Sequence, residues 1–164
     1  MTGITITRMS DIAPTHSSDH PKYEFYKHAV TDSAYKYEVS SPREGNQTVA
    51  AFYVLPPGKS NYPYHYHTTN EEVFYMISGG GLLETSDGER SVKAGDIIVC
   101  PAGKQGAHKI TNNTQEDLVY LDVDTNHTPD IAYYPHSNKV GIRHAGGMRD
   151  NFRLDGNVKY YEGE

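Results

Sequence analysis

Two histidines separated by one residue, His65 and His67, are followed closely by a pair of glutamates, Glu71 and Glu72. In an extended strand the side chains at positions i and i+2 point to the same face, so the two imidazoles would lie together. A short polar turn follows, and a hairpin there would bring a carboxylate back opposite the histidines. A third histidine, His108, heads another short extended run. Three imidazoles and one carboxylate on one face form a ligand set for a divalent transition metal.

Glycines and a proline stand at fixed intervals around these residues, in the order Gly58-x6-His65-x-His67-x4-Glu72-x6-Gly79 and Gly95-x5-Pro101-x-Gly103-x4-His108-x3-Asn112. This pattern resembles the paired motifs of the cupin superfamily. The resemblance implies an antiparallel jelly-roll β-barrel (a double-stranded β-helix) that holds one metal. Carried over by position, the ligands would be His65, His67, Glu72 and His108. The Gly103–His108 interval is longer than the usual two residues, a variant that resembles a metal-binding group of single-domain bacterial cupins.

The choice between the two glutamates depends on the motif. Glu71 and Glu72 face opposite sides of a strand, and the run 73–77 is apolar on both faces, so alternation does not distinguish them. The six-residue interval to Gly79 favours Glu72. The ligand types suit iron, manganese, nickel, cobalt or zinc. A six-coordinate ion would keep two positions for water, O2 or a substrate, whereas four protein ligands would close a tetrahedral zinc site.

Residues that share a face with the ligands are expected to line the mouth of the barrel. By the period of two, these are Phe74 and Met76 after the glutamate and Ile110 after the third histidine. They predict an apolar pocket for a small molecule, although core packing would account for the same residues. The motif region offers only Lys104 and Lys109 as cations, so it predicts no clear phosphate site.

Composition limits the partners and the location of the protein. The net charge of −6 argues against nucleic acid or an anionic membrane, since both require a basic face. No apolar stretch approaches the length of a membrane span, and the N-terminus lacks the pattern of a signal peptide. The single cysteine, Cys100, excludes an internal disulfide and fits a reducing compartment. We therefore expect a cytoplasmic protein whose partner is a small-molecule substrate or ligand.

Short apolar runs at roughly 8–12-residue intervals, separated by glycine or asparagine turns, predict an all-β fold without any helix. We expect one domain with three parts: an N-terminal arm with edge strands (1–45), a barrel core (46–125) and a C-terminal arm (126–164). Within these, 35–39 alternates like a strand, and 97–100 reads as a buried strand. The stretch from His144 is expected to lie over the barrel or to reach across a homodimer, because exposed sheet edges invite pairing.

Two classes of function fit these expectations. The first is a metal-dependent enzyme on a small molecule, which the resemblance implies to be of the dioxygenase or sugar or sugar-phosphate isomerase type. The second is a non-enzymatic small-molecule-binding protein whose metal fixes the ligand or the fold. The sequence assigns no catalytic residue and no cofactor beyond the metal, because one barrel hosts many chemistries.

Overall fold

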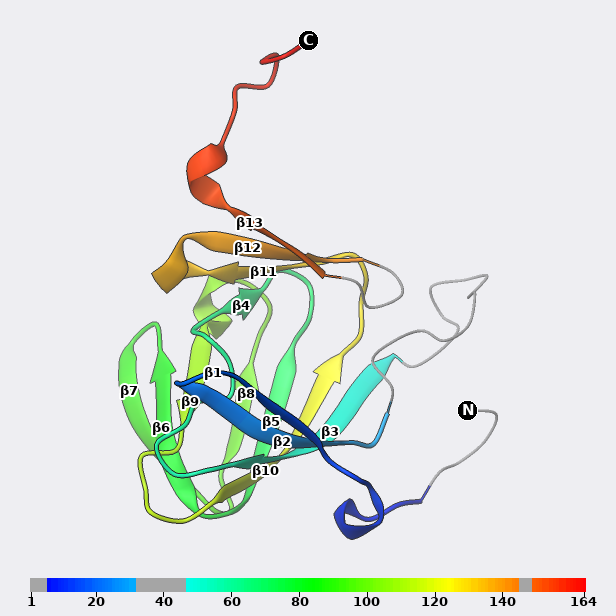
Figure 1. Cartoon of the computed structure of the whole chain (residues 1–164), viewed down its shortest axis with the longest axis vertical. Helices are drawn as coiled ribbons and strands as arrows, with labels where there is room; N and C mark the ends of the chain where they lie inside the picture. The colour runs from blue at the N-terminus through cyan, green and yellow to red at the C-terminus, as the bar shows by residue number, and fades with distance from the viewer. Residues whose placement is uncertain (1–5, 32–46, 145–148) are drawn as a thin grey trace.

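The computed structural model describes residues 6–31, 47–144 and 149–164. Within these residues the chain forms β-strands and four short 3-10 helices (η1–η4), and every strand ladder is antiparallel. The predicted all-β fold is confirmed (Figure 1). The strands are β1 (Thr15–His20), β2 (Tyr23–Ala29), β3 (Thr48–Leu55), β4 (Tyr66–His67), β5 (Glu72–Ser78), β6 (Gly80–Thr85), β7 (Gly88–Lys93), β8 (Ile97–Cys100), β9 (His108–Thr111), β10 (Leu118–Thr125), β11 (Asp130–Tyr134), β12 (Lys139–Arg143) and β13 (Arg149–Arg153).

The strands form one continuous six-stranded sheet and two smaller sheets. The six-stranded sheet has the order β1-β2-β3-β10-β5-β8, and the smaller sheets have the orders β7-β6-β9 and β13-β12-β11-β4. A backbone bridge between His65 and His108 joins the two smaller sheets at the point where β4 and β9 meet. β6 and β7 form a hairpin that turns at Ser86 and Asp87.

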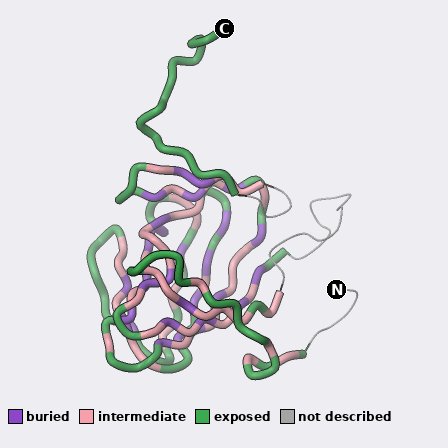
Figure 2. Tube along the Cα trace, viewed as in Figure 1, coloured by how far each residue is buried: buried purple, intermediate pink, exposed green. Residues whose placement is uncertain are grey.

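Side chains alternate between the two faces of each central strand, and the side chains of one face lie in the core. On β3 the side chains of Val49, Ala51, Tyr53 and Leu55 are buried, and the residues between them are half-buried. Only one face of this strand is therefore fully buried. The buried residues of β3, of its neighbour β10 and of β5 beyond it belong to the hydrophobic core (Figure 2).

Two local predictions were wrong. The histidines and the glutamate do not belong to one hairpin, because β4 pairs with β11 whereas β5 pairs with β10 and β8. Residues 97–100 form an edge strand rather than a buried one, with Ile97 67% and Val99 63% exposed. An apolar run could not distinguish a core strand from an edge strand with one uncovered apolar face.

The C-terminal stretch also differs from the prediction. Its first part, β13, pairs with β12 at the edge of the four-stranded sheet. Residues 154–164 are exposed throughout and lead away from the barrel instead of lying over it (Figures 1 and 2). The strand predicted at 35–39 lies outside the described residues. In the part of the chain that the structure describes, no helix is long and apolar enough to span a membrane.

Candidate metal centre

The three histidines come from two strand segments that face each other. The backbone amide of His65 donates to the carbonyl oxygen of His108 (3.1 Å), and the amide of His108 donates back to His65 (2.9 Å). This reciprocal pair places the two imidazoles on the same face, with ring centroids 4.9 Å apart. His67 follows at i+2, and its ring centroid lies 5.2 Å from that of His65. All three rings are buried or nearly so.

Each ring is oriented by a hydrogen bond through its Nδ1 atom. Nδ1 of His65 donates to the carbonyl oxygen of Pro63 (2.8 Å), and Nδ1 of His108 donates to that of Gly106 (2.9 Å). A carbonyl oxygen only accepts, so Nδ1 carries the proton and Nε2 of a neutral ring keeps a lone pair. The third ring, His67, bonds through Nδ1 to the carboxylate of Asp130. The three Nε2 atoms are thereby left for a common partner.

Glu72 faces the three Nε2 atoms from the start of β5. One carboxylate oxygen lies 4.0 Å from Nε2 of His65 and 3.6 Å from Nε2 of His67, and the other lies 3.1 Å from Nε2 of His108. Glu72 is buried, whereas Glu71 is exposed, so the structure brings Glu72 to the histidines. His65, His67 and Glu72 each offer a ligand atom within 4.8 Å of the others.

The electrostatics of the group fit a bound cation. Nε2 of His108 is buried and has no hydrogen-bond partner among the described residues, although it faces a carboxylate oxygen. Burial lowers the pKa of His108 to about 4 and that of His65 well below its ordinary value, so neither ring takes up a proton near neutral pH. Burial also raises the pKa of Glu72 to about 7. A divalent metal would satisfy these lone pairs and stabilise the carboxylate.

Asp130, at the start of β11, is a site residue that sequence reasoning missed. Its Oδ2 accepts from Nδ1 of His67, and its Oδ1 accepts from the backbone amide of Thr69 (3.1 Å). Burial alone would raise the pKa of Asp130, but the hydrogen bond from His67 and its positive charge lower it to about 2. A carboxylate behind a ligating histidine fixes the orientation of the ring. Asp130 lies outside both motifs, so their spacing gave no signal for it.

The long interval between Gly103 and His108 folds as a single turn of 3-10 helix, η2 (Lys104–Gly106). Gly106 packs so tightly that a Cβ atom there would lie 1.8 Å from the carbonyl oxygen of Pro101. The carbonyl group of Gly106 is also the acceptor that orients His108. The extra residues therefore form a specific support for the third histidine.

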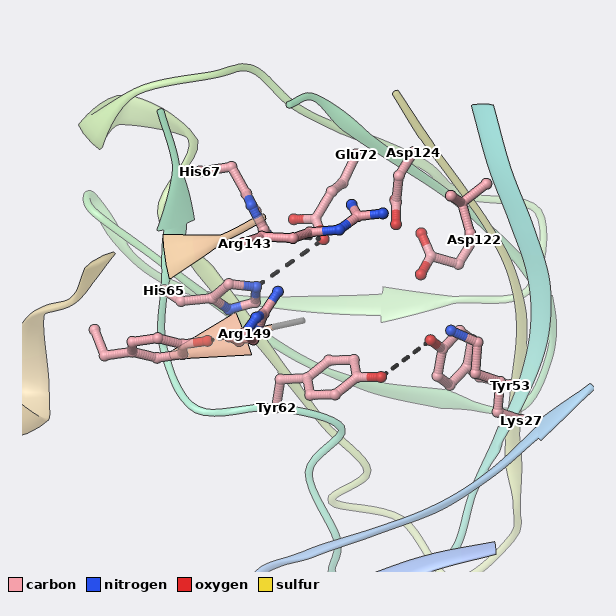
Figure 3. Close-up of a pocket in the computed structure, with 12 residues that line it drawn as sticks. Lys27, Tyr53, Tyr62, His65, His67, Glu72, Asp122, Asp124, Arg143 and Arg149 are labelled. Atoms are coloured by element: carbon pink, nitrogen blue, oxygen red, sulfur yellow. Dashed lines mark hydrogen bonds and ion pairs between the residues drawn. The ribbon is translucent and has the colours of Figure 1, made fainter. Parts of the chain in front are cut away.

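A cavity of about 280 Å³ adjoins the histidines and the glutamate (Figure 3). Its walls are mostly polar, and they are formed by Lys27, Val49, Tyr53, Tyr62, His65, His67, Glu72, Asp122, Asp124, Tyr134, Arg143 and Arg149. The expected pocket residues Phe74, Met76 and Ile110 do not belong to this set. All three are fully buried members of the hydrophobic core, and Phe74 packs edge-on against His108.

Two carboxyl groups on β10, Asp122 and Asp124, line the same cavity as His65, His67 and Glu72. Burial, together with the neighbouring carboxylate, raises the pKa of Asp122 well above its ordinary value. Near them, the hydroxyl groups of Tyr53 and Tyr62 hydrogen-bond to each other (3.1 Å). The Tyr62 side chain lines the cavity.

Three cations also line the cavity, although none lies in the motif region. Lys27 comes from β2, Arg143 from the end of β12 and Arg149 from the start of β13. Arg149 donates to the hydroxyl of Tyr134 (2.9 Å), and Arg143 donates to the side-chain oxygen of Asn126. Only the folded chain brings them together, because their positions in the sequence are far apart.

Comparisons with known proteins agree with this architecture. Residues 51–124 match the family model described as Cupin domain. A curated relative, the oxalate-binding protein of Thermotoga maritima, is 33% identical over 69 residues, which cover 42% of this chain and 54% of the relative. The chain thus matches about half the length of that relative.

Solved structures resemble the chain more completely. A candidate sugar phosphate isomerase from Acidithiobacillus ferrooxidans superposes with a TM-score of 0.77 at 22% identity, over 97% of this chain and 96% of that one. A predicted oxalate decarboxylase from Thermotoga maritima superposes with a TM-score of 0.60 at 26% identity, over 75% of this chain and 100% of that one. The match over residues 51–124 shows that this part of the chain is a cupin domain, and the superpositions confirm the predicted jelly-roll β-barrel fold.

Proposed function

We propose that this protein binds one divalent transition metal through His65, His67, Glu72 and His108 and coordinates a small carboxylate ligand in the adjoining cavity. The observation that carries the metal site is the set of three Nε2 atoms facing one buried carboxylate, including the unpartnered Nε2 of His108. Iron, manganese, nickel, cobalt or zinc would suit these ligands. The metal would supply Lewis-acid activation of the ligand.

The charge of the cavity supports an anionic ligand. Arg143, Arg149 and Lys27 line it, and a divalent metal would add further positive charge. Arginine is well suited to a carboxylate because its planar guanidinium donates two parallel hydrogen bonds. The relative named oxalate-binding protein and the structure titled as a predicted oxalate decarboxylase support a small carboxylate in particular.

Elemental analysis of protein purified without chelator tests the metal, and calorimetry with oxalate tests the ligand. We expect close to one equivalent of metal per chain, and oxalate binding that disappears when the metal is removed. Protein that neither retains metal nor takes it up on reconstitution would overturn the proposal. Metal binding without oxalate binding would leave the metal centre standing and refute the carboxylate ligand.

A second candidate is an enzyme of the dioxygenase or sugar-phosphate isomerase type. It is favoured by the carboxyl pair of Asp122 and Asp124, which faces the same cavity as the metal and could exchange protons with a bound molecule. The three cations would also suit a phosphate group. Oxygen consumption and sugar-phosphate isomerisation by the metal-loaded protein test the two types. Turnover in either assay would establish the enzyme, and its absence in both would favour ligand binding alone.

A homodimer is proposed through the outer face of β5 and β8. Tyr75 and Ile97 are directly paired across these strands, and both are exposed, as are Ile77 and Val99. An exposed apolar patch at a sheet edge is a common site of association. A second copy related by a two-fold axis would cover the patch with the same residues.

Cys100 supports the proposal of a reducing, cytoplasmic location. It is a buried free thiol, and burial raises its pKa to about 12.

A further inference from the structure

Arg149 reaches the cavity from the edge of the four-stranded sheet. It begins β13, which pairs with β12, and β12 pairs in turn with β11. The side chain of Arg149 nevertheless donates to the hydroxyl of Tyr134 on β11 (2.9 Å), so it crosses the strand between them. Figure 3 shows Arg149 beside His65, against which the ring of Tyr134 stacks with centroids 5.7 Å apart. Arg149 thus lies at the histidine end of the cavity.

A glycine on β12 leaves the space through which Arg149 crosses. Gly141 lies inside the strand, and its backbone does not adopt the left-handed conformation that favours glycine. A Cβ atom at this position would lie 3.3 Å from Cδ of Arg149, 3.5 Å from Cε2 of Tyr134 and 2.9 Å from Oδ1 of Asn151. Glycine inside a strand weakens it and often marks the close approach of another group. Here the stem of Arg149 runs where a side chain at position 141 would lie.

The position of Arg149 in the sheet is unfavourable unless an anion offsets its charge. Arg149 is paired directly with Arg143 across β12 and β13, and both residues line the cavity. Like charges directly opposite each other destabilise an antiparallel pair of strands. Within residues 6–31, 47–144 and 149–164, Arg149 forms no ion pair with a carboxylate, and its hydrogen bond goes to the hydroxyl of Tyr134. An anion bound between the arginines and the histidines would reduce this repulsion.

The other cations of the cavity lie near carboxyl groups of the chain itself. Figure 3 shows Arg143 beside Asp124, and Lys27 on the side of the cavity where Asp122 lies. Burial is the largest influence on the pKa of Asp124, which it raises, and the charges of Lys27 and Arg143 act against it. Arg149 therefore differs from both in having its charge available to a bound ligand.

We infer that Arg149 binds the carboxylate ligand beside the metal, and that Gly141 is the positioning residue that lets it reach the ligand. This inference rests on the proposed function, because the ligand is held at the metal. The hydrogen bond to Tyr134 restrains the guanidinium before the ligand binds, which lowers the entropy lost on binding. A hydrogen bond from a guanidinium to a carboxylate is also stronger than one between neutral groups.

A purely structural role is the main alternative, in which Arg149 holds Tyr134 and, through the stacked ring, His65. The two roles predict different effects on the metal. Loss of a support for His65 would weaken metal binding. Loss of a positive charge beside the site would leave metal affinity unchanged or increase it, because the charge repels the metal ion. Ligand affinity and metal affinity, measured on the same variants, therefore separate the two roles.

Calorimetry with oxalate on the metal-loaded protein and competition with a chromophoric chelator measure the two affinities. The variants are Arg149→Gln, Arg149→Lys, Gly141→Val and the double variant of Arg149→Gln with Gly141→Val. Gly141→Ala is added in case valine prevents folding. Arg153→Gln is the matched control for the arginine, because Arg153 lies on the same strand but does not line the cavity. Gly156→Ala is the control for the glycine, because a Cβ atom there would meet nothing within 4 Å.

We expect Arg149→Gln to weaken oxalate binding about ten- to 100-fold, as the loss of a hydrogen bond to a charged group does, while metal affinity stays unchanged or rises. Arg149→Lys keeps the charge without the planar fork and should lose less. Gly141→Val should weaken oxalate binding about as much as Arg149→Gln, and Gly141→Ala should weaken it a few-fold. The double variant should bind no more weakly than Arg149→Gln, because both changes remove the same contact. Both controls should bind oxalate like the wild type.

Oxalate affinity that changes by less than about two-fold in Arg149→Gln would overturn the inference. A parallel loss of metal affinity would do so too, since it identifies the structural role. Full oxalate affinity in a folded Gly141→Val, or losses that add in the double variant, would refute the role of Gly141. In each of these cases metal-dependent oxalate binding by the wild type would still support the proposed function. If the wild type binds no oxalate in a metal-dependent way, the proposed carboxylate ligand fails, and the inference fails with it.

Discussion

Replacement of Asp130 by asparagine tests whether the carboxylate behind His67 supports a metal site. The substitution keeps the size of the side chain, but it removes the charge that accepts from Nδ1 of His67. The amide oxygen can still accept from the backbone amide of Thr69, so the local backbone should persist. We therefore expect a folded protein in which the ring of His67 is held less firmly and is a weaker ligand.

The magnitude follows from the pKa of Asp130. Its decrease from an ordinary value of 3.8 to about 2 corresponds to about 2.4 kcal/mol, at about 1.36 kcal/mol for each pH unit. Residues other than His67 also contribute, since Asn70 and the amide of Thr69 bond to the same carboxylate. The interaction with His67 is thus worth up to about 2 kcal/mol, or roughly 30-fold in metal affinity. Loss of a carboxylate behind a ligating histidine typically costs about 10- to 100-fold.

Competition with a chromophoric chelator at neutral pH measures the metal affinity of Asp130→Asn. Asp150→Asn is the matched control, because it breaks a similar pair with His144 (3.0 Å) on the exposed surface. The control should bind metal like the wild type. If the Asp130 variant folds and keeps its metal affinity within about two-fold, or if the control loses as much, the proposed role of Asp130 is refuted.

Three further predictions concern the metal ligands, pH and association. The double substitution His65→Ala and His67→Ala should abolish metal retention yet leave a cooperative unfolding transition, because the strand pattern does not need the imidazoles; unfolding of the variant would instead identify a structural metal. Burial raises the pKa of Glu72 from 4.5 to about 7, so in the metal-free protein Glu72 holds a proton that the unfolded state releases, and its own contribution to the free energy of unfolding should decrease by up to about 3 kcal/mol as pH rises across that window, whereas the lowered pKa values of His65 and His108 act in the opposite direction. Denaturant titrations of the metal-free wild type and of Glu72→Gln isolate this contribution, and a wild type that does not lose stability relative to Glu72→Gln from pH 5 to pH 7 would contradict it. For the homodimer, light scattering should give a dimeric mass for the wild type and a monomeric one for Ile97→Lys; a monomeric wild type would rule the dimer out.

The fold and the proximity of the histidines were predictable from the sequence because both depend on local order. Alternation and turn residues mark the strands, and the i, i+2 relation of His65 and His67 survives in any extended segment. Which strands pair with one another was not predictable in the same way. Glu72 reaches the histidines from another sheet, since β5 pairs with β10 and β8 rather than with β4. The motif spacing favoured Glu72, which is the glutamate that the structure brings to the histidines, although β4 and β5 do not form the assumed hairpin.

The remaining wall of the cavity depends on long-range contacts. Lys27, Arg143 and Arg149, which line the cavity, lie on three different strands, and Asp130, behind His67, lies on a fourth. No spacing relates these residues to the motifs. The period of two also failed for the pocket, because Phe74 shares a face with Glu72 and yet packs in the core. Residues on one face of a strand can line the cavity at one end of the strand and pack in the core a few residues later. Which of them line the cavity depends on how the facing sheet packs against the strand.

That boundary is visible on β10 and gives the cavity its chemical character. The inward face of β10 runs from Leu118 and Tyr120, which are sealed in the core, to Asp122 and Asp124, which open to the cavity. A core of the same volume could have been closed with apolar residues, and a buried carboxyl pair is costly to maintain. The cost is reduced where carboxyl groups face cations, and Lys27, Arg143 and Arg149 line the same cavity. A polar wall of this kind suits a ligand that itself carries both charge and hydrogen-bond donors, and it would reject an apolar molecule of the same size.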